Sequence, residues 1–140
     1  EGFGQYAAIL AVAAGTPDPA AFRADMLERR FRTNVTSAPA FLKRLPLIEL
    51  SRVASTRYAE DFRTGRLVFS RGGLMAAAID EHIQRQTSGA KSLRDALQYL
   101  VAWTAKEQRA FTVEELPALM QAATGVDTRA VIEEWLKPLP

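Results

Sequence analysis

The residue types that most often carry out chemistry are sparse in this sequence. His82 is the only histidine, and Gln86 stands four residues later, where a second ligand on the same helix face would lie. Because a catalytic zinc ion normally has three protein ligands, we expect no metal site at His82. Asp80 and Glu81 are adjacent, so on a helix their side chains point about 100° apart and cannot form a general acid and base pair. The sequence has no cysteine, which excludes disulfides and thiolate metal sites.

A carboxylate motif opens the chain. Glu1, Gly2 and Phe3 are followed by Tyr6 one helical turn later. This segment resembles the E-G-F-x-x-Y segment that follows the H-E-x-x-H helix in gluzincin metallopeptidases. In that family the glutamate is the third zinc ligand, beside two histidines, and one coordination position stays open for water. The resemblance makes Glu1 a candidate zinc ligand; the alternative is a solvated acidic residue, which the macrodipole favours at a helix start.

A second group of motifs extends the resemblance along the chain. It comprises Phe69-Ser70-Arg71-Gly72-Gly73-Leu74, then Ile79-Asp80, Ile83, Ser88-Gly89 and Ser92-Leu93-Arg94-Asp95. In order and spacing these segments resemble the Y-x-K-G-A-L, L-D, I-R, G and S-L-D-D pattern of glycyl aminopeptidase-type gluzincins. The last part of the chain, with Phe111-Thr112, Glu114-Glu115-Leu116, Thr124-Gly125 and Trp135, resembles the final two helices of that family. The chain is thus similar to the C-terminal helical part of such an enzyme, loosely over residues 33–67 and best over residues 69–135.

Two departures from the family pattern limit the activity that we expect. The family's two histidines and its catalytic glutamate precede the segment that corresponds to Glu1, so they are not in this chain. Phe69 stands where the family has a tyrosine that donates a hydrogen bond to the developing oxyanion. A phenyl ring cannot donate, and losing one such donor typically costs about 10²- to 10³-fold in rate. We therefore expect no catalysis by this chain alone, and zinc only in a parent protein whose H-E-x-x-H helix is intact.

The residues after Phe69 are expected on the substrate side of the cleft. The resemblance gives this place to Arg71, Gly72 and Gly73. Arg71 could orient a substrate carboxylate or carbonyl, and the alternative is a surface arginine with no substrate role. The two glycines, with the small side chains at positions 76–78, would also let a neighbouring backbone approach closely.

The hydrophobic periodicity predicts helices and no clear strand. We expect helices over residues 1–14, 19–32, 40–44 and 70–87, and Asp18 is expected to cap the second of them. Three more helices are expected to begin at a capping box of Ser92 and Asp95, at a capping box of Thr112 and Glu115, and after Asp127. The rest of residues 33–67, which Pro39 and Pro46 interrupt, is expected to be partly irregular. The predicted fold is all-α: a single compact bundle of about six helices. It resembles the C-terminal helical subdomain of a gluzincin catalytic domain, so we expect residues 1–140 to be one domain and a fragment of a longer chain.

Composition excludes several classes of function. The 140 residues are 48% hydrophobic, and 18 basic against 16 acidic residues give a net charge of only +2. Without a basic stripe we expect no nucleic-acid partner. The longest purely apolar stretch, residues 6–14, is far shorter than the roughly 20 residues that span a bilayer, so we expect no membrane partner.

Three interpretations of function remain open. In the first, the chain is the helical half of a zinc aminopeptidase-like protein, and its partners are the upstream part of the same polypeptide and peptides with a free N-terminus. In the second, it is a non-catalytic pseudopeptidase or a helical domain that binds peptides or proteins. In the third, it is an unrelated helical adaptor. The resemblance also suggests a bacterial protein, periplasmic or exported, although the chain contains no targeting signal that indicates its location.

Overall fold

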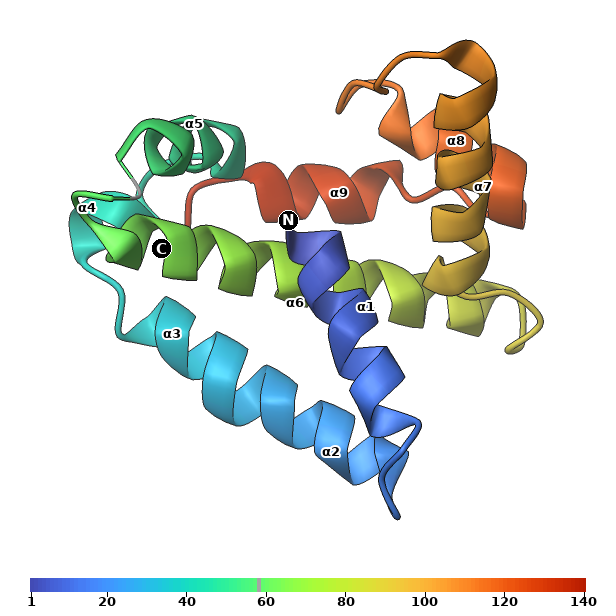
Figure 1. Ribbon diagram of the computed structural model, residues 1–140, viewed down its shortest axis with the longest axis horizontal. Helices are drawn as coiled ribbons and strands as arrows, with labels where there is room; N and C mark the ends of the chain where they lie inside the picture. The colour runs from blue at the N-terminus through green and yellow to red at the C-terminus, as the bar shows by residue number, and fades with distance from the viewer. Residues whose placement is uncertain (58) are drawn as a thin grey trace. The chain divides into compact units, whose positions relative to one another are not determined.

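The computed structural model describes residues 1–57 and 59–140, and every secondary-structure element in these two ranges is helical (Figure 1). The elements are α1 (Gly2–Ala13), α2 (Pro19–Asp25), the π-helical η1 (Met26–Arg32), α3 (Thr33–Thr36), α4 (Ala40–Lys43), α5 (Leu47–Arg57), α6 (Phe62–Gln86), α7 (Leu93–Glu107), α8 (Leu116–Thr124) and α9 (Arg129–Leu136). The prediction of an all-α fold is confirmed. The chain divides into two compact units: the first comprises residues 1–77 and 135–140, and the second comprises residues 78–134.

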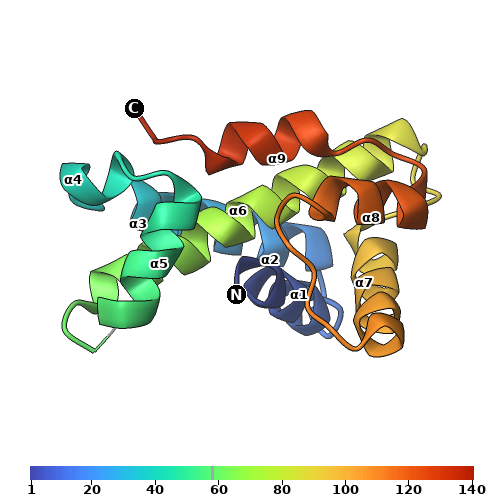
Figure 2. The ribbon, with the colours of Figure 1, turned by 90° about the horizontal axis from the view of Figure 1, so that it is seen from above.

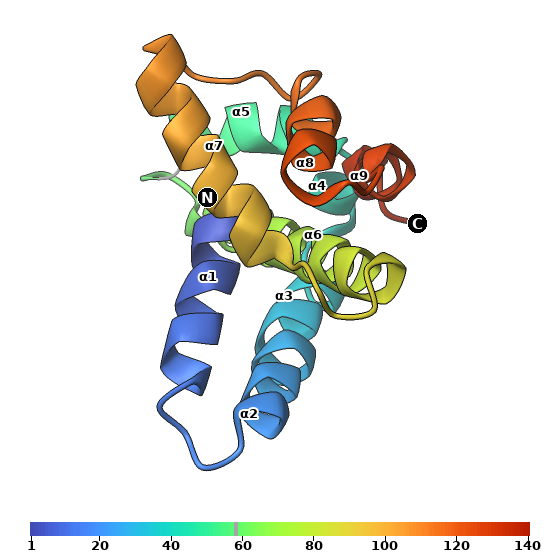
Figure 3. The ribbon, with the colours of Figure 1, turned by 90° about the vertical axis from the view of Figure 1, so that its right-hand side faces the viewer.

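The first unit begins with two helical segments joined by a turn. Figure 3 shows α1 leading through this turn into α2, which continues without a break through η1 into α3. The turn ends at Asp18, whose Oδ1 accepts a hydrogen bond from the Ala21 backbone N–H at 2.9 Å, and Pro19 occupies the first helical position. The predicted cap is confirmed. The helical stretch ends at Thr36 rather than at residue 32, because no breaker precedes Pro39.

The segment expected to be irregular is mostly helical. Helix α5 buries Leu47, Leu50 and Ala54, which recur at helical spacing along one face. Pro46 immediately precedes the helix, where proline is tolerated because its missing N–H would have no helical partner there. Helix α6 likewise begins at Phe62, eight residues before the predicted start at Ser70. The prediction of irregular structure over residues 47–57 and 62–67 was therefore wrong.

Two apolar clusters form the core of the first unit. Figure 2 shows α4 and α5 beside the first turns of α6, and the first cluster joins these helices through Leu42, Leu47, Leu50, Ala54, Leu67 and Val68. The second cluster joins α1, η1 and α6 through Ile9, Phe31 and Leu74. Helix α6 contributes to both clusters, so it is the central element of the first unit.

The second unit combines the end of α6 with α7, α8 and most of α9, and α7 packs beside α8. Its buried apolar residues include Ile79, Ile83, Leu93, Ala96, Leu100, Leu116, Met120, Val126 and Ile132. The two predicted capping boxes are confirmed: the backbone N–H of Ser92 donates to Asp95 Oδ2, and that of Thr112 donates to Glu115 Oε2, both at 2.9 Å. Among the described helices, none is long and apolar enough to cross a membrane.

Candidate functional site

The helix that carries Glu1 crosses α6 at two glycines. A Cβ atom added to Gly72 would lie 2.8 Å from the Cα atom of Gly2, and a Cβ atom added to Gly2 would overlap the Gly72 backbone. Only glycine allows two backbones to approach so closely. The predicted close approach at Gly72 is confirmed, and its consequence is that the first residues of the chain are fixed against the middle of α6.

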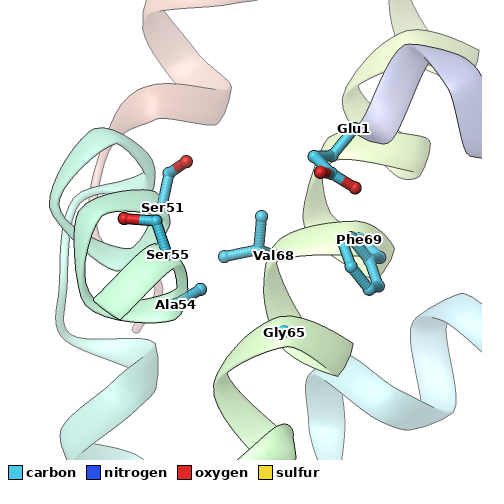
Figure 4. A pocket seen from close by; sticks show the side chains of 7 residues that line it. All are labelled: Glu1, Ser51, Ala54, Ser55, Gly65, Val68 and Phe69. Atoms are coloured by element: carbon cyan, nitrogen blue, oxygen red, sulfur yellow. The ribbon is translucent and has the colours of Figure 1, made fainter. Parts of the chain in front are cut away.

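Glu1 and Phe69 line the same cavity, which has a volume of about 310 Å³ (Figure 4). Figure 4 shows Glu1 and Phe69 on one side of the cavity and residues of α5 on the other. The remaining lining residues are Ser51, Ala54 and Ser55 from α5, and Gly65 and Val68 from α6. Two motifs that are far apart in the sequence therefore meet at one cavity within the first unit.

The walls of this cavity are largely apolar, and its polar side chains are the exposed Glu1 carboxylate and two serine hydroxyls. Ser55 Oγ donates to the Arg52 backbone carbonyl at 2.8 Å, so this hydroxyl is already used within α5. A nucleophilic serine needs a base within hydrogen-bond reach, and the described lining residues include no histidine or lysine.

The α5 side of the cavity was not among the predicted site residues. Residues 47–57 were expected to belong to a partly irregular segment, so Ser51, Ala54 and Ser55 could not be placed on one helix. The signal was present in the spacing of the buried residues of α5, which recur three and four positions apart.

The described residues of this chain do not form a metal site on their own. No group of three or more His, Cys, Asp and Glu side chains in the described part of the chain could hold a metal ion. Glu1 supplies a single carboxylate, whereas a catalytic zinc ion needs about three protein ligands. Any zinc ion bound at Glu1 would therefore need ligands from outside this chain.

Arg71 is buried rather than exposed. Its side chain is fully shielded from solvent, so the alternative of a surface arginine is wrong. Its Nη1 atom donates to the Leu45 carbonyl at 2.9 Å, and its Nη2 atom donates to the carbonyls of Lys137 at 2.6 Å and Trp135 at 3.3 Å. Burial lowers the pKa of Arg71. The guanidinium joins three segments of the first unit, and the substrate-side role stays a prediction.

The two glycines after Arg71 also serve packing. Gly72 contacts Gly2, as described above, and a Cβ atom on Gly73 would overlap the ring of Phe31, which lies in the core. Both glycines are buried. Both glycines therefore have a packing role in this structure, and their substrate-side role stays a prediction.

The remaining candidate residues lie in the second unit and form intrachain hydrogen bonds. Asp80 is 2% exposed, and its Oδ1 accepts from the Leu93 backbone N–H at 2.9 Å, at the start of α7. His82 Nε2 lies 3.0 Å from the Asp127 carbonyl oxygen. Glu81 is exposed. Asp80 thus satisfies one of the free N–H groups at the start of a helix, which is a structural role.

Comparisons with known proteins assign no family to the chain. No family model, no curated protein and no solved structure matches it. The geometry of the cavity and the motif resemblance are therefore the grounds for the proposal that follows.

Proposed function

We propose that this chain is the helical half of a zinc aminopeptidase-like domain of the glycyl aminopeptidase type, and that it is not catalytic alone. The observation that carries the proposal is the shared cavity of Glu1 and Phe69. In the family that the motifs resemble, the corresponding glutamate binds the zinc ion and the corresponding tyrosine donates a hydrogen bond to the oxyanion, so both must face one site. The shared cavity of Glu1 and Phe69 agrees with this requirement.

Each part of the cavity has a place in this proposal. Glu1 supplies one zinc ligand, and the Gly2–Gly72 contact fixes its position relative to α6. The apolar wall of Ala54 and Val68 takes a substrate side chain. The upstream part of the polypeptide supplies the H-E-x-x-H helix, and peptides with a free N-terminus are the substrates.

The second candidate is a non-catalytic domain that binds peptides. The observation that favours it is Phe69, whose ring lines the cavity but has no hydroxyl to donate to an oxyanion. An apolar cavity that keeps its shape after losing a catalytic donor can still hold a peptide side chain. The two candidate functions share the peptide-binding surface and differ in whether the peptide bond is hydrolysed.

An aminopeptidase assay separates the two candidates. The assay uses a protein in which the parent's H-E-x-x-H helix precedes Glu1, and it compares that protein with its Phe69→Tyr variant. If the domain is an enzyme, the restored hydroxyl raises kcat by about 10²- to 10³-fold. Phe41→Tyr, at a ring that is 62% exposed on α4, is the control and leaves kcat unchanged. Peptide binding without cleavage in all three proteins would support the non-catalytic domain and contradict the enzyme.

A further inference from the structure

A second cavity, of about 300 Å³, shares Phe69 with the cavity of Glu1. It lies within the first unit, and its polar lining comes from four elements: Gln5 of α1, Arg30 of η1, Asn34 of α3, and Arg66 and Ser70 of α6. Phe69 therefore lies at the border of two cavities, one of which has a carboxylate and the other of which has two guanidinium groups.

The charge of the second cavity is unbalanced. Its described lining residues include Arg30 and Arg66 but no aspartate or glutamate. In the described part of the chain, neither of these arginines forms an ion pair, whereas their neighbours do. Arg29 pairs with Asp25, Arg32 with Glu28 and Arg63 with Asp61, at 2.6 to 2.8 Å. Within this group of five arginines, the two without a carboxylate partner are thus the two that line the cavity.

Contacts within the chain hold several polar side chains of this cavity in place. The Asn34 amide donates to Ser70 Oγ at 3.0 Å, and Ser70 is only 1% exposed. The Arg66 guanidinium lies over the Phe62 ring, 5.1 Å from its centroid, which limits the positions that this flexible side chain takes. A cavity that presents positioned donors and an unbalanced positive charge is suited to an anion.

We propose that this second cavity binds a carboxylate of a short peptide. Arginine is the side chain best matched to a carboxylate, because its planar guanidinium can donate two parallel hydrogen bonds. The orientation of the peptide rests on the proposed function: its N-terminal residue lies in the cavity of Glu1, and the chain passes Phe69 towards Arg30 and Arg66. The substrates are then short peptides whose carboxylate lies only a few residues from the N-terminus.

Peptide binding to the chain itself tests this proposal. The probes are tri-alanine with a free C-terminal carboxylate and tri-alanine amide, titrated by calorimetry and followed through the arginine Nε–H signals by NMR. The expected result is that the acid binds at least about 10-fold more tightly than the amide, as for a charge-assisted hydrogen bond. Equal affinities of the two peptides, or no binding of the acid, would overturn the proposal.

Four variants with the same charge change locate the site. Arg30→Gln and Arg66→Gln are expected to remove the preference for the acid, while Arg29→Gln and Arg63→Gln, at the ion-paired neighbours, are expected to keep it. Equal effects of all four would show a nonspecific charge effect and overturn the proposal. A third peptide, Ala-Glu-Ala amide, distinguishes a side-chain carboxylate from the C-terminal one; binding of either carboxylate at Arg30 and Arg66 supports the site.

The test of the carboxylate site does not depend on whether the longer protein is an active enzyme. If the longer protein cleaves acid and amide peptides with equal KM, the aminopeptidase proposal stands and the carboxylate site fails. If the chain prefers the acid through Arg30 and Arg66 but the longer protein cleaves nothing, the carboxylate site stands and the enzyme proposal fails.

Discussion

Gly2 and Gly72 contact each other backbone to backbone where α1 crosses α6. Gly2 follows the candidate zinc ligand Glu1, and Gly72 lies three residues after Phe69, which lines the same cavity. The contact therefore sets the position of Glu1 relative to Phe69. Gly72, which the sequence suggested for the substrate side, thus also sets the geometry of the cavity.

Alanine substitution tests this contact. Gly2→Ala and Gly72→Ala each place a methyl group into the opposing backbone, so we expect each to destabilise the chain by about 1–3 kcal/mol, as overpacking does. Gly4→Ala is the matched control, because a Cβ atom there meets nothing within 4 Å. It is expected to be neutral or slightly stabilising, since alanine favours a helix by about 0.5–1 kcal/mol over glycine. Urea unfolding measures all three, and equal stability of Gly4→Ala and Gly72→Ala would contradict the close contact.

Removal of the Arg71 guanidinium should destabilise the first unit. Arg71→Met keeps much of the apolar stem but leaves the carbonyls of Leu45 and Lys137 without their donor. We expect a loss of about 1–3 kcal/mol in the free energy of unfolding, as when a buried acceptor is left without its donor. Arg94→Met, at an exposed arginine of α7, is the control and should change stability by less than about 0.5 kcal/mol. A small effect of Arg71→Met would argue against its role in joining three segments.

The hydrogen bond that the buried Asp80 carboxylate accepts can be tested with a control substitution at the next residue. Asp80→Ala leaves the Leu93 backbone N–H at the start of α7 without its acceptor, and an unsatisfied buried donor costs about 1–3 kcal/mol. Glu81→Ala changes the next residue, which is exposed, and should be nearly neutral. Thermal unfolding of the two variants compares them directly. Equal melting temperatures would show that the hydrogen bond contributes little.

We expect the ion pair of Arg109 and Glu115 to stabilise the folded chain at neutral pH and to lose this effect at acid pH. Hydrogen bonds from the Arg109 guanidinium, and then from the Thr112 backbone N–H, lower the pKa of Glu115 from its ordinary 4.5 to about 2. Because the pKa is lowered in the folded state, this contribution is fully present above about pH 5 and is lost as the pH falls towards 2. Glu115→Gln should therefore reduce the loss of stability over that range.

The control for the pH experiment is the neighbouring exposed residue Glu114. Glu114→Gln removes the same charge without touching the hydrogen bonds of Glu115. Urea unfolding at several pH values between about 2 and 6 compares the slopes of stability against pH. If Glu115→Gln and the unchanged chain lose stability in parallel, the contribution assigned to this pair is wrong.

The parts of the fold that depend on local chemistry could be predicted from the sequence. The capping residue Asp18 and the pair of Ser92 and Asp95 act through hydrogen bonds to backbone only three residues away, so short motifs identify them. Gly125 ends α8 with φ of 77°, a conformation that glycine adopts readily.

The parts that depend on tertiary contacts could not be predicted in this way. Arg71 looked like a surface residue because its three acceptors come from residues 45, 135 and 137, which only the fold brings together. Pro46 suggested an interruption because a proline before a helix and a proline within one look alike in a sequence. The cavity of Glu1 could not be predicted in full for the same reason, since three of its seven lining residues lie on α5.

The proposed role of Glu1 as a zinc ligand can be measured by zinc calorimetry on a protein in which the H-E-x-x-H helix precedes Glu1, with and without Glu1→Gln. We expect that the longer protein binds one zinc ion, that Glu1→Gln weakens this binding severely, and that the present chain alone binds none tightly. If the longer protein and its Glu1→Gln variant bind zinc with equal affinity, Glu1 is not a ligand and the proposed function is wrong.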